Sequence, residues 1–294
     1  MVVFVSPCQG IALPFAQRKF AVPLTHLHLH EAPLTFVDVE TTGLRPELGH
    51  RVVEIALLRT QGLETVDTFV SLLNPQRPID PGAARVNGIT DFMVADAPTF
   101  DQILPDLLPF LQETILVAHN APFDMGFLQA EFRRAGEPFT PGPILDTLML
   151  ARRQYYFASN SLGNIARRLG IHTPHAHRAL GDVQTTFAIF RRFTADLIRR
   201  GQVRVADWIR AQGGTAWRPP PVAAGLPAGH PLRIALERKC DVQITYRAAS
   251  GRCTERVVTP LDCAGGYLIG HCHLRGEQRT FRLDRIETIT LIEP

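Results

Sequence analysis

Three short segments of the chain carry acidic and histidine side chains that could do chemistry. They read FVDVETTG at 36–43, HNAPFD at 119–124 and HRALGD at 177–182. Together they supply four carboxylates and one histidine: Asp38, Glu40, Asp124, Asp182 and His177. Several carboxylates can hold two divalent cations, and a neutral histidine can accept a proton from an attacking water near pH 7. The set therefore predicts a two-metal site that hydrolyses a phosphodiester.

Asp38 and Glu40 lie two residues apart in an apolar segment, so on a strand their side chains share one face. Two like charges in a buried strand repel each other and are costly unless a cation neutralises them. Mg²⁺ or Mn²⁺ is the natural counter-ion, because hard cations prefer carboxylate oxygens. The alternative is that either carboxylate caps the turn into Thr41, Thr42 and Gly43.

Asp124 and Asp182 each fall in the first turn of an expected helix, where a carboxylate also suits the helix dipole. His119 and Asn120 follow a short apolar strand, at the end where ligands of such sheets usually bind. We therefore expect both to contact a substrate.

The general base is one of three neighbouring histidines. His177 lies five residues before Asp182, in a loop that could bring it over the same cleft. His172 and His175 compete with it, and spacing alone does not choose among the three.

The order of the expected elements predicts a mixed α/β sheet covered by helices. Apolar alternation indicates strands at 34–40, 51–59, 65–73, 114–118 and 143–148. Helical periodicity indicates helices at 99–111, from about 122, at 160–169 and at 178–199, with Thr99 as an N-cap. The alternation from His26 to His30 would place three histidines on one solvated strand face.

The domain boundaries follow from composition. Residues 1–33 show little periodicity and are expected to be an N-terminal extension, followed by the catalytic domain at 34–200. Residues 201–230 contain paired glycines and consecutive prolines, and predict a linker. Residues 231–294 predict a short helix at 231–239 and five short strands in a small β-barrel or sandwich.

The three acidic segments resemble the three exonuclease motifs of the DEDD superfamily, in its histidine-containing, DnaQ-like branch. That branch includes the epsilon subunit of bacterial DNA polymerase III, and the resemblance spans roughly residues 34–198. It implies an RNase H-like fold and a 3′→5′ exonuclease that uses two divalent ions, with Asp38, Glu40, Asp124 and Asp182 as their ligands. The family pattern His-Arg-Ala-x-x-Asp selects His177 as the base.

The resemblance also implies residues that contact the substrate. Thr41, Thr42 and Gly43 match the turn that lies along the 3′-terminal nucleotide in relatives. Asn87, in Val86-Asn87-Gly88-Ile89, stands where many relatives carry histidine, so its substrate contact stays open.

The tail resembles the WYL domain of bacterial regulators. The segment GYLIGHCHLRGEQRTFRLDRI at 266–286 carries the resemblance, although Gly266 replaces the name-giving tryptophan before Tyr267 and Leu268. Such domains are thought to bind nucleic acid or nucleotide-like ligands. The expected phosphate contacts are Arg247, Arg256, Arg279, Arg282 and Arg285. The alternative is ion pairing with the acidic residues Glu255, Glu277, Asp284 and Glu287.

Composition sets broad limits. The formal charge is +3 and the pI is near 8.7, which permits nucleic-acid binding without arguing for it.

The five cysteines include no Cys-x-x-Cys pair, so free thiols in a reducing compartment are expected. His271, Cys272 and His273 are consecutive, so on a strand they cannot converge on a metal. No leader or membrane-length apolar run stands out, and we expect a cytoplasmic protein with no membrane partner.

The expected partner is nucleic acid, DNA rather than RNA, with a nucleotide effector at the tail as a further candidate. The motifs contact phosphate and metal rather than sugar, so an RNA 3′-trimming exonuclease is one alternative. The other is a regulator whose nuclease fold only binds nucleic acid. Neither the polymerase or other protein partner nor the oligomeric state follows from the sequence.

Overall fold

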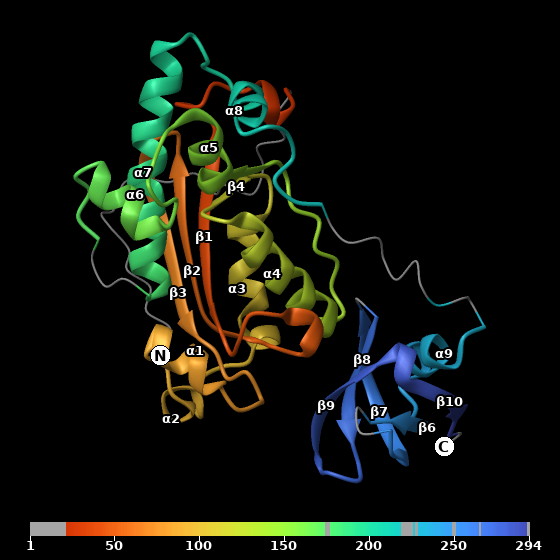
Figure 1. Ribbon diagram of the computed structural model, residues 1–294. Helices are drawn as coiled ribbons and strands as arrows, with labels where there is room; N and C mark the ends of the chain where they lie inside the picture. The colour runs from red at the N-terminus through yellow and green to blue at the C-terminus, as the bar shows by residue number, and fades with distance from the viewer. Residues whose placement is uncertain are drawn as a thin grey trace. The chain divides into compact units, whose positions relative to one another are not determined.

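The computed structural model describes residues 22–173, 177–218, 226, 229–248, 251–264 and 266–292 (Figure 1). The chain divides into two compact units, one of Met1–Gly43 with Val52–Arg218 and one of Leu44–Arg51 with Pro219–Pro294. No helix in the described ranges is long and apolar enough to cross a membrane. The four cysteines in these ranges are free thiols.

The first unit is built on a five-stranded sheet of mixed direction, which confirms the predicted α/β class. Its strand order is β3 (Glu64–Leu72), β2 (Val52–Gln61), β1 (Pro33–Thr41), β4 (Ile115–Ala118) and β5 (Ile144–Asp146). The first three strands pair antiparallel, whereas β1, β4 and β5 pair parallel. Strand β1 is therefore central, and its two faces carry alternating residues into two separate cores.

Helices cover both faces of this sheet (Figure 1). On one face α3 (Phe100–Leu111) and α4 (Ala121–Ala135) pack against Val37 and Val39 of β1. On the other face four helices pack around Phe36: α5 (Thr147–Gln154), α6 (Leu162–Arg168), α7 (Ala179–Arg199) and α8 (Val205–Ala211). Thr99 caps α3 in a capping box with Gln102, as its sequence predicts.

Several short elements lie beyond the sequence prediction. Helices α1 (Pro81–Asn87) and α2 (Asp91–Val94) lie near a small core around Val53 and Ile89. Helix α5 begins at Thr147, directly after β5, where the sequence predicts a strand to residue 148. Residues 26–30 do not form the expected strand: a short 3-10 helix (Leu24–His26) precedes an isolated bridge from His28 to Arg204. A second 3-10 helix spans Pro46–Leu48.

The segment expected to be a linker contributes to the nuclease core. Trp208 of α8 is fully buried and stacks on Phe190, with ring centroids 4.3 Å apart. Gln212 is also fully buried, and its side chain accepts a hydrogen bond from the backbone N–H of Asp146 at 2.9 Å. Trp217 packs on Phe139 at 5.8 Å. The glycines and prolines mark turns here, while buried aromatic rings hold the chain to the sheet through residue 217.

The expected N-terminal extension is likewise partly built into the core. Leu29 and Ala32 are fully buried against the α7 side of the sheet. Residues 1–21 lie outside the described ranges.

The second unit contains the predicted short helix and five short strands. Helix α9 (Pro231–Arg238) accompanies an antiparallel sheet in the order β10 (Ile286–Leu291), β6 (Val242–Arg247), β7 (Cys253–Ala264), β8 (Tyr267–Cys272) and β9 (Glu277–Arg282). A 3-10 turn, Leu283–Arg285, links the last two strands along the chain. Among the described residues no pairing joins β9 to β10, so the predicted barrel is an antiparallel sheet with these two edges.

Candidate active site

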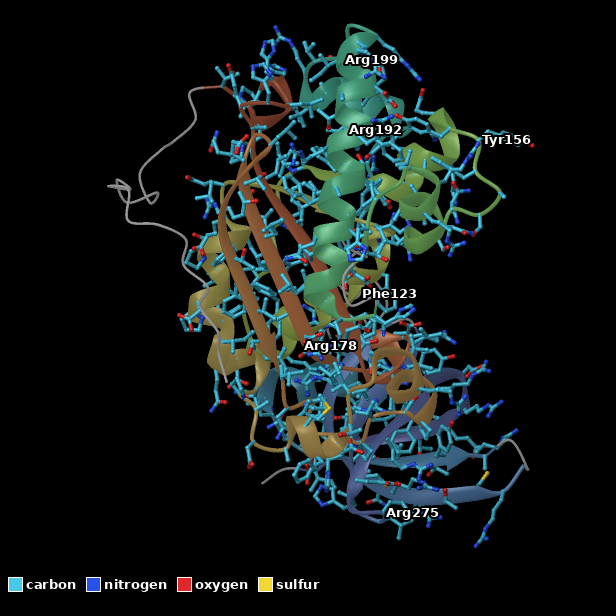
Figure 2. The ribbon with its side chains drawn as sticks, turned by 90° about the vertical axis from the view of Figure 1, so that its left-hand side faces the viewer. Phe123, Tyr156, Arg178, Arg192, Arg199 and Arg275 are labelled. Atoms are coloured by element: carbon cyan, nitrogen blue, oxygen red, sulfur yellow. The ribbon has the colours of Figure 1, made fainter. Side chains whose placement is uncertain are left out.

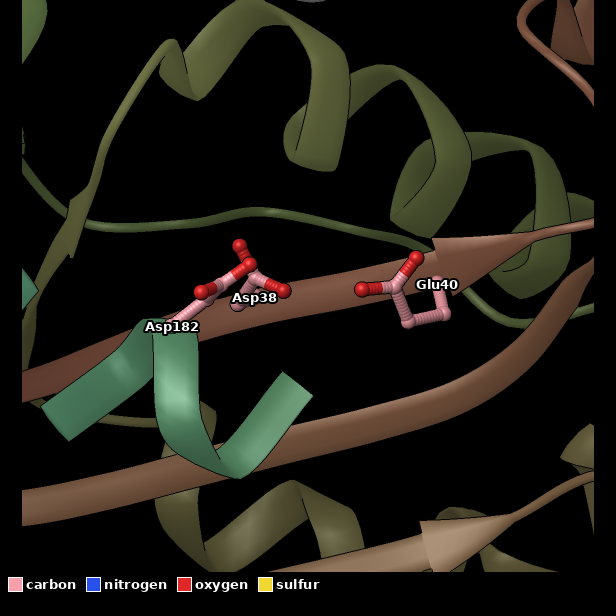
Figure 3. Close-up of side chains that lie close together, drawn as sticks. All are labelled: Asp38, Glu40 and Asp182. Atoms are coloured by element: carbon pink, nitrogen blue, oxygen red, sulfur yellow. The ribbon is translucent and has the colours of Figure 1, made fainter. Parts of the chain in front are cut away.

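Three of the predicted carboxylates converge beside strand β1. Oxygen atoms of Asp38, Glu40 and Asp182 all lie within 4.8 Å of one another. Figure 3 shows Asp38 and Glu40 on β1, with the Asp182 side chain of α7 lying next to Asp38. The two-residue spacing and the first turn of α7 thus produce the cluster that the sequence predicts.

Asp124 joins this cluster from the adjacent helix. Strand β4 ends at Ala118, so it cannot pair with the backbone of β1 as far along as Val39. The carboxylate of Asp124, in the first turn of α4, accepts that free N–H of Val39 at 3.1 Å. The Asp124 side chain is buried, with 3% of its surface exposed. The Asp124 carboxylate is therefore held where β4 stops pairing with β1 and leaves the Val39 N–H available.

Asp146 fixes the start of the helix that carries Asp124. Its buried carboxylate accepts hydrogen bonds from the backbone N–H groups of Asn120 and Ala121, each at 3.1 Å. The same carboxylate caps α5 through the N–H groups of Leu148 and Met149. One side chain thus holds the first turns of two helices. The sequence signal was its place directly before a helix start, Asp146-Thr147.

Burial and mutual repulsion alter the acidity of the cluster. Burial raises the pKa of Asp38 well above its usual range, and the charges of Asp124, Asp182 and Glu40 raise it further. Burial also raises the pKa of Asp124 and of Asp182, although the nearby His177 opposes the latter shift. Holding these carboxylates close together in their charged forms therefore destabilises the folded protein.

The pKa of Glu40 is raised in the same way. Burial raises the pKa of Glu40 to about 7, and the carboxylates of Asp182 and Glu54 contribute. A hydrogen bond from Asn87 and the charge of Arg178 oppose this rise in pKa. A divalent cation would remove the repulsion, and a set of carboxylate oxygens suits Mg²⁺ or Mn²⁺. The donor set thus fits the metals that the sequence implies.

His177 lies two residues before Ala179, the first residue of α7, and Arg178 is the N-cap between them. Its backbone has a φ of +63°, a left-handed conformation that is uncommon for a residue with a side chain. Its backbone N–H donates to the Asp182 carboxylate, and its side chain is exposed. His172 is also exposed, and His175 lies outside the described residues. Of the candidates described, His177 is the one tied to the carboxylate cluster.

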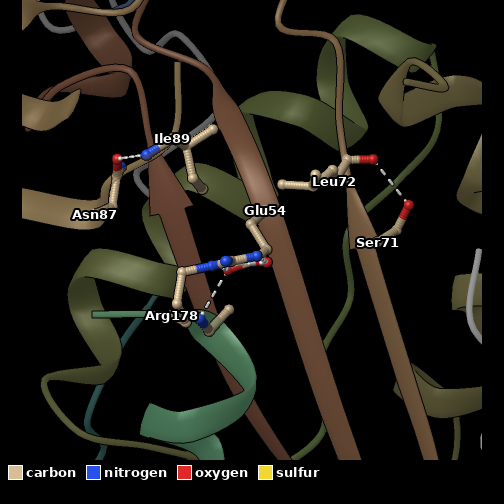
Figure 4. Close-up of polar contacts among 7 residues, drawn as sticks. Glu54, Ser71, Leu72, Asn87, Ile89 and Arg178 are labelled. Carbon is tan, nitrogen blue, oxygen red and sulfur yellow. Dashed lines mark hydrogen bonds and ion pairs between the residues drawn. The ribbon is translucent and has the colours of Figure 1, made fainter. Parts of the chain in front are cut away.

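Glu54 of β2 and Arg178 form a pair that the sequence analysis missed (Figure 4). The Arg178 Nε donates to both Glu54 carboxylate oxygens, at 3.0 and 3.2 Å, and Nη2 donates to one of them at 2.5 Å. The backbone N–H of Ala179 adds a fourth bond at 2.9 Å. Glu54 is buried, with 2% exposure. The signal was a lone acid inside the apolar strand RVVEIALLR, because such an acid needs a partner.

The turn residues expected at the substrate are mostly interior. Thr42 is fully buried, and the buried Thr41 hydroxyl donates to the Gly43 carbonyl at 2.6 Å. Gly43 is buried as well. The Thr41 hydroxyl is therefore used within the turn, and both threonine side chains are buried, while the expected nucleotide contact of this segment stays a prediction.

Asn87 is likewise used by the protein. It is 5% exposed, and its amide nitrogen donates to the Thr41 carbonyl at 3.3 Å and to Glu40. Its amide oxygen accepts the N–H of Ile89 at 3.0 Å (Figure 4). Asn87 therefore supports Glu40 from helix α1, and a contact between Asn87 and the substrate stays a prediction.

His119 and Asn120 differ from each other. Both ring nitrogens of His119 are occupied, by the Thr147 hydroxyl at 2.9 Å and the Asn160 carbonyl at 3.0 Å. Burial lowers the pKa of His119. Asn120 is exposed, with a left-handed φ of +72°, beside the first turn of α4. Of the two, Asn120 is the one placed to meet a ligand.

The arginines of the second unit are largely ion-paired. Arg247 pairs with Glu287, Arg279 with Glu277 at 2.9 Å, and Arg282 with Asp284 at 2.6 Å. Half-buried Arg256 instead lies over the Phe281 ring, 5.9 Å from its centroid. Arg285 lies in the 3-10 turn after β9. Exposed ion pairs are worth about 0–1 kcal/mol, so a phosphate could still replace the carboxylates.

The comparisons with known proteins agree with this geometry. The exonuclease family of the RNase T type matches residues 35–190, and the WYL domain matches residues 230–291. The PolC-type DNA polymerase III of Bacillus cereus is 36% identical over 185 residues, which are 61% of this chain and 13% of that protein. A DNA polymerase III epsilon-like protein of Rhodobacter capsulatus is 40% identical over 183 residues, 59% of this chain and 26% of that protein.

The chain thus spans only a small part of the length of these relatives. Among solved structures, E. coli exonuclease I in complex with a dT13 oligonucleotide has a TM-score of 0.53 at 17% identity. That alignment covers 81% of this chain and 55% of the other, and it supports the fold alone. Because the family match takes in all three acidic segments and more than half of the sequence, this chain belongs to the exonuclease family and carries a WYL domain at its C-terminal end.

Proposed function

We propose that the protein is a metal-dependent 3′→5′ exonuclease that hydrolyses phosphodiester bonds at DNA 3′ ends. The observation that carries this proposal is the convergence of Asp38, Glu40 and Asp182 within 4.8 Å, with buried Asp124 beside them. Membership of the exonuclease family supports the reaction class. The names of the relatives, which are DNA polymerase III proteins, favour DNA over RNA.

The four carboxylates would hold two divalent ions, Mg²⁺ or Mn²⁺. When bound, such ions stabilise the charge that develops on the attacking and leaving oxygens of an in-line displacement. His177 would accept a proton from the attacking water, since a neutral imidazole is available near pH 7. Exposed Asn120 and the backbone of Thr41 to Gly43 would contact the terminal nucleotide.

The WYL domain would bind single-stranded nucleic acid or a nucleotide ligand. The planar guanidinium fork suits phosphate, and five arginines lie on or next to strands of this small sheet. Their exposed carboxylate partners are weak competitors for a dianionic or polyanionic ligand.

The test is a substrate panel with a metal titration. Wild-type protein is incubated with single-stranded, duplex and mismatched DNA and with RNA, at increasing Mg²⁺ or Mn²⁺, and the ends that shorten are identified by end-labelling. Loss of nucleotides from DNA 3′ ends is expected, and Asp38→Ala is expected to abolish it. The matched control is Asp106→Ala, which removes an exposed carboxylate of α3.

Other outcomes would contradict parts of the proposal. Shortening of RNA alone would replace the DNA substrate. Binding of nucleic acid without cleavage under any metal condition would overturn the enzymatic reading and favour a regulator.

A further inference from the structure

The charge of the nuclease unit is divided between two stretches of sequence. Residues 34–146 contain seven arginines against sixteen carboxylates, a formal charge of −9. Residues 147–218 contain twelve arginines against three carboxylates, a formal charge of +9. The net charge of the whole chain, +3, hides this division. Such an imbalance is the electrostatic footprint expected of a surface that meets a polyanion.

The fold gathers the positive stretch on one side of the sheet. Helices α5, α6, α7 and α8 share the core around Phe36, whereas α3 and α4 belong to the core on the opposite face. The positive charges therefore lie on one helical layer. Figure 2 looks onto this layer, with Arg178 near the start of α7 and Arg192 and Arg199 farther along it.

Among the described residues, six exposed arginines within the bounds of these four helices have no carboxylate within ion-pair distance. We call them the basic face: Arg152, Arg153, Arg167, Arg168, Arg191 and Arg192. Other arginines of the layer are neutralised, since Arg199 pairs with Asp196 and Arg210 with Asp207. These guanidinium groups have no acidic partner there, although Arg167 donates to the Asn164 side chain at 3.1 Å, so their charge is available to an external anion.

A simpler explanation covers only part of this face. Arg152 and Arg153 lie in the last turn of α5, and Arg167 and Arg168 in the last turn of α6. Arginine there complements the negative end of a helix dipole. Arg191 and Arg192 lie in the middle of the 21-residue helix α7, where the dipole has no effect. Arg191 also lies over the Phe187 ring, 5.7 Å from its centroid, but neither the ring nor the dipole neutralises the charge of the pair.

Helix α7 connects this pair to the active site. Asp182 lies in its first turn, and Arg191 and Arg192 follow nine and ten residues later. At 1.5 Å per residue the pair lies about 14–15 Å along the axis from Asp182. One strand of a duplex carries a phosphate about every 3.4 Å, so the separation corresponds to about four phosphates. At 3.6 residues per turn, Arg191 and Arg192 lie about 180° and 280° around the helix from Asp182, on its exposed side. A strand that ends in the site must therefore curve over α7 to meet the pair.

We propose that the basic face binds the phosphate backbone of the substrate strand behind its 3′ end. This inference rests on the proposed function, and it assigns to α7 a second role besides carrying Asp182. The face would bind every sequence, because arginine–phosphate contacts read no bases. It would lengthen the time that a long strand stays bound between cleavage steps.

The experiment compares two pairs of substitutions in the full-length protein. Arg191→Gln with Arg192→Gln neutralises the central pair while keeping polar side chains of moderate length. Arg199→Gln with Arg210→Gln is the control, with the same change in charge at arginines that are already ion-paired. Affinity is measured for a short and a long DNA oligonucleotide with Ca²⁺ replacing Mg²⁺, at several salt concentrations, and duplex and single-stranded forms are compared. Turnover of the 5′-p-nitrophenyl ester of thymidine monophosphate is measured with Mg²⁺ or Mn²⁺.

For the Arg191 and Arg192 variant we expect affinity for the long strand to fall about tenfold, and the slope of log K against log salt to shrink by about 1 to 2. In the control variant, long-strand affinity and the salt slope should each change less. Turnover of the small ester should be unchanged in the two variants. Unchanged long-strand affinity and salt slope in the first variant, or equal losses in the control, would overturn the inference. Failure of wild-type protein to cleave both the small ester and the DNA of the substrate panel would instead overturn the proposed function. The salt slopes of DNA binding would still decide whether the basic face binds phosphate.

Discussion

Glu54 of β2 holds Arg178 through three hydrogen bonds at a buried carboxylate, and this pair fixes where helix α7 begins. Arg178 follows His177 directly, and Asp182 lies one turn later. The Glu54 carboxylate also accepts the N–H of Ala179 at 2.9 Å. The proposed base and one proposed metal ligand are therefore positioned by a contact to a neighbouring strand, although Glu54 belongs to none of the three motifs.

Loss of this pair should slow the reaction without weakening substrate binding. For Arg178→Gln we expect kcat to fall between about 10- and 100-fold with little change in KM, because a displaced reacting group lowers the rate steeply. The free energy of unfolding should fall by about 1–3 kcal/mol, since Glu54 loses a buried partner. Steady-state kinetics and thermal unfolding check both values.

The matched control for this variant is Arg199→Gln, which breaks an ion pair on the same helix. Arg199 is 70% exposed, so its pair should contribute less than about 1 kcal/mol and nothing to kcat. Equal kinetic effects of the two substitutions would show that α7 is not positioned by Glu54. A KM effect larger than the kcat effect would instead indicate that Arg178 contacts the substrate.

Asp38→Asn should separate activity from stability. We expect cleavage to fall more than about 100-fold, because loss of a group that merely supports a metal ligand already costs 10–100-fold. In the absence of divalent metal the same variant should melt at a higher temperature than wild type, since it removes a repelled, partly desolvated charge. A lower melting temperature of Asp38→Asn without metal would contradict the electrostatic repulsion within the cluster.

The metal-free protein should lose stability as pH rises toward and through neutrality. The pKa of Glu40 is about 7 in the folded state and 4.5 in its ordinary state, so the folded protein holds this proton more tightly. The stability that protonated Glu40 gives the folded state is fully present below pH 4.5 and is lost as pH rises through 7. The free energy of unfolding should fall by up to about 3 kcal/mol over this range. Added Mg²⁺ should raise the melting temperature more at pH 8 than at pH 5.5. A Mg²⁺ effect that is independent of pH would argue against metal binding at Glu40.

The nuclease unit should be stable when cut after Arg218 but weakened when cut after Gly214. The shorter form lacks Trp217, which packs on Phe139, and Ala216, which is buried in the same core. Loss of these contacts should cost about 2 kcal/mol, or a fall in melting temperature of about 4–8 °C. Identical melting curves for the two truncated forms would show that residues 215–218 do not belong to this unit.

Much of the fold could be predicted because its longer elements are locally consistent. Strands β1 to β3 alternate clearly, and Thr99 with Gln102 marks the start of α3. The short helices α1, α2, α5 and α8 were missed, since helices of four to eight residues are stabilised by tertiary packing more than by their own sequence. Trp208 made residues near 205–211 part of the core, whereas the glycines and prolines around them favoured a linker.

The sequence by itself determined which carboxylates meet. Asp38 and Glu40 share a strand face by their spacing, and the first turns that carry Asp124 and Asp182 follow from local helix signals. Only the tertiary structure decided what supports and surrounds them. Buried groups must satisfy their hydrogen bonds with whatever lies nearby in space, so Asn87, His119, Asp146 and Glu54 took partners far away in the chain. The basic face likewise exists only because packing on one side of a sheet gathers the three helices α5, α6 and α7.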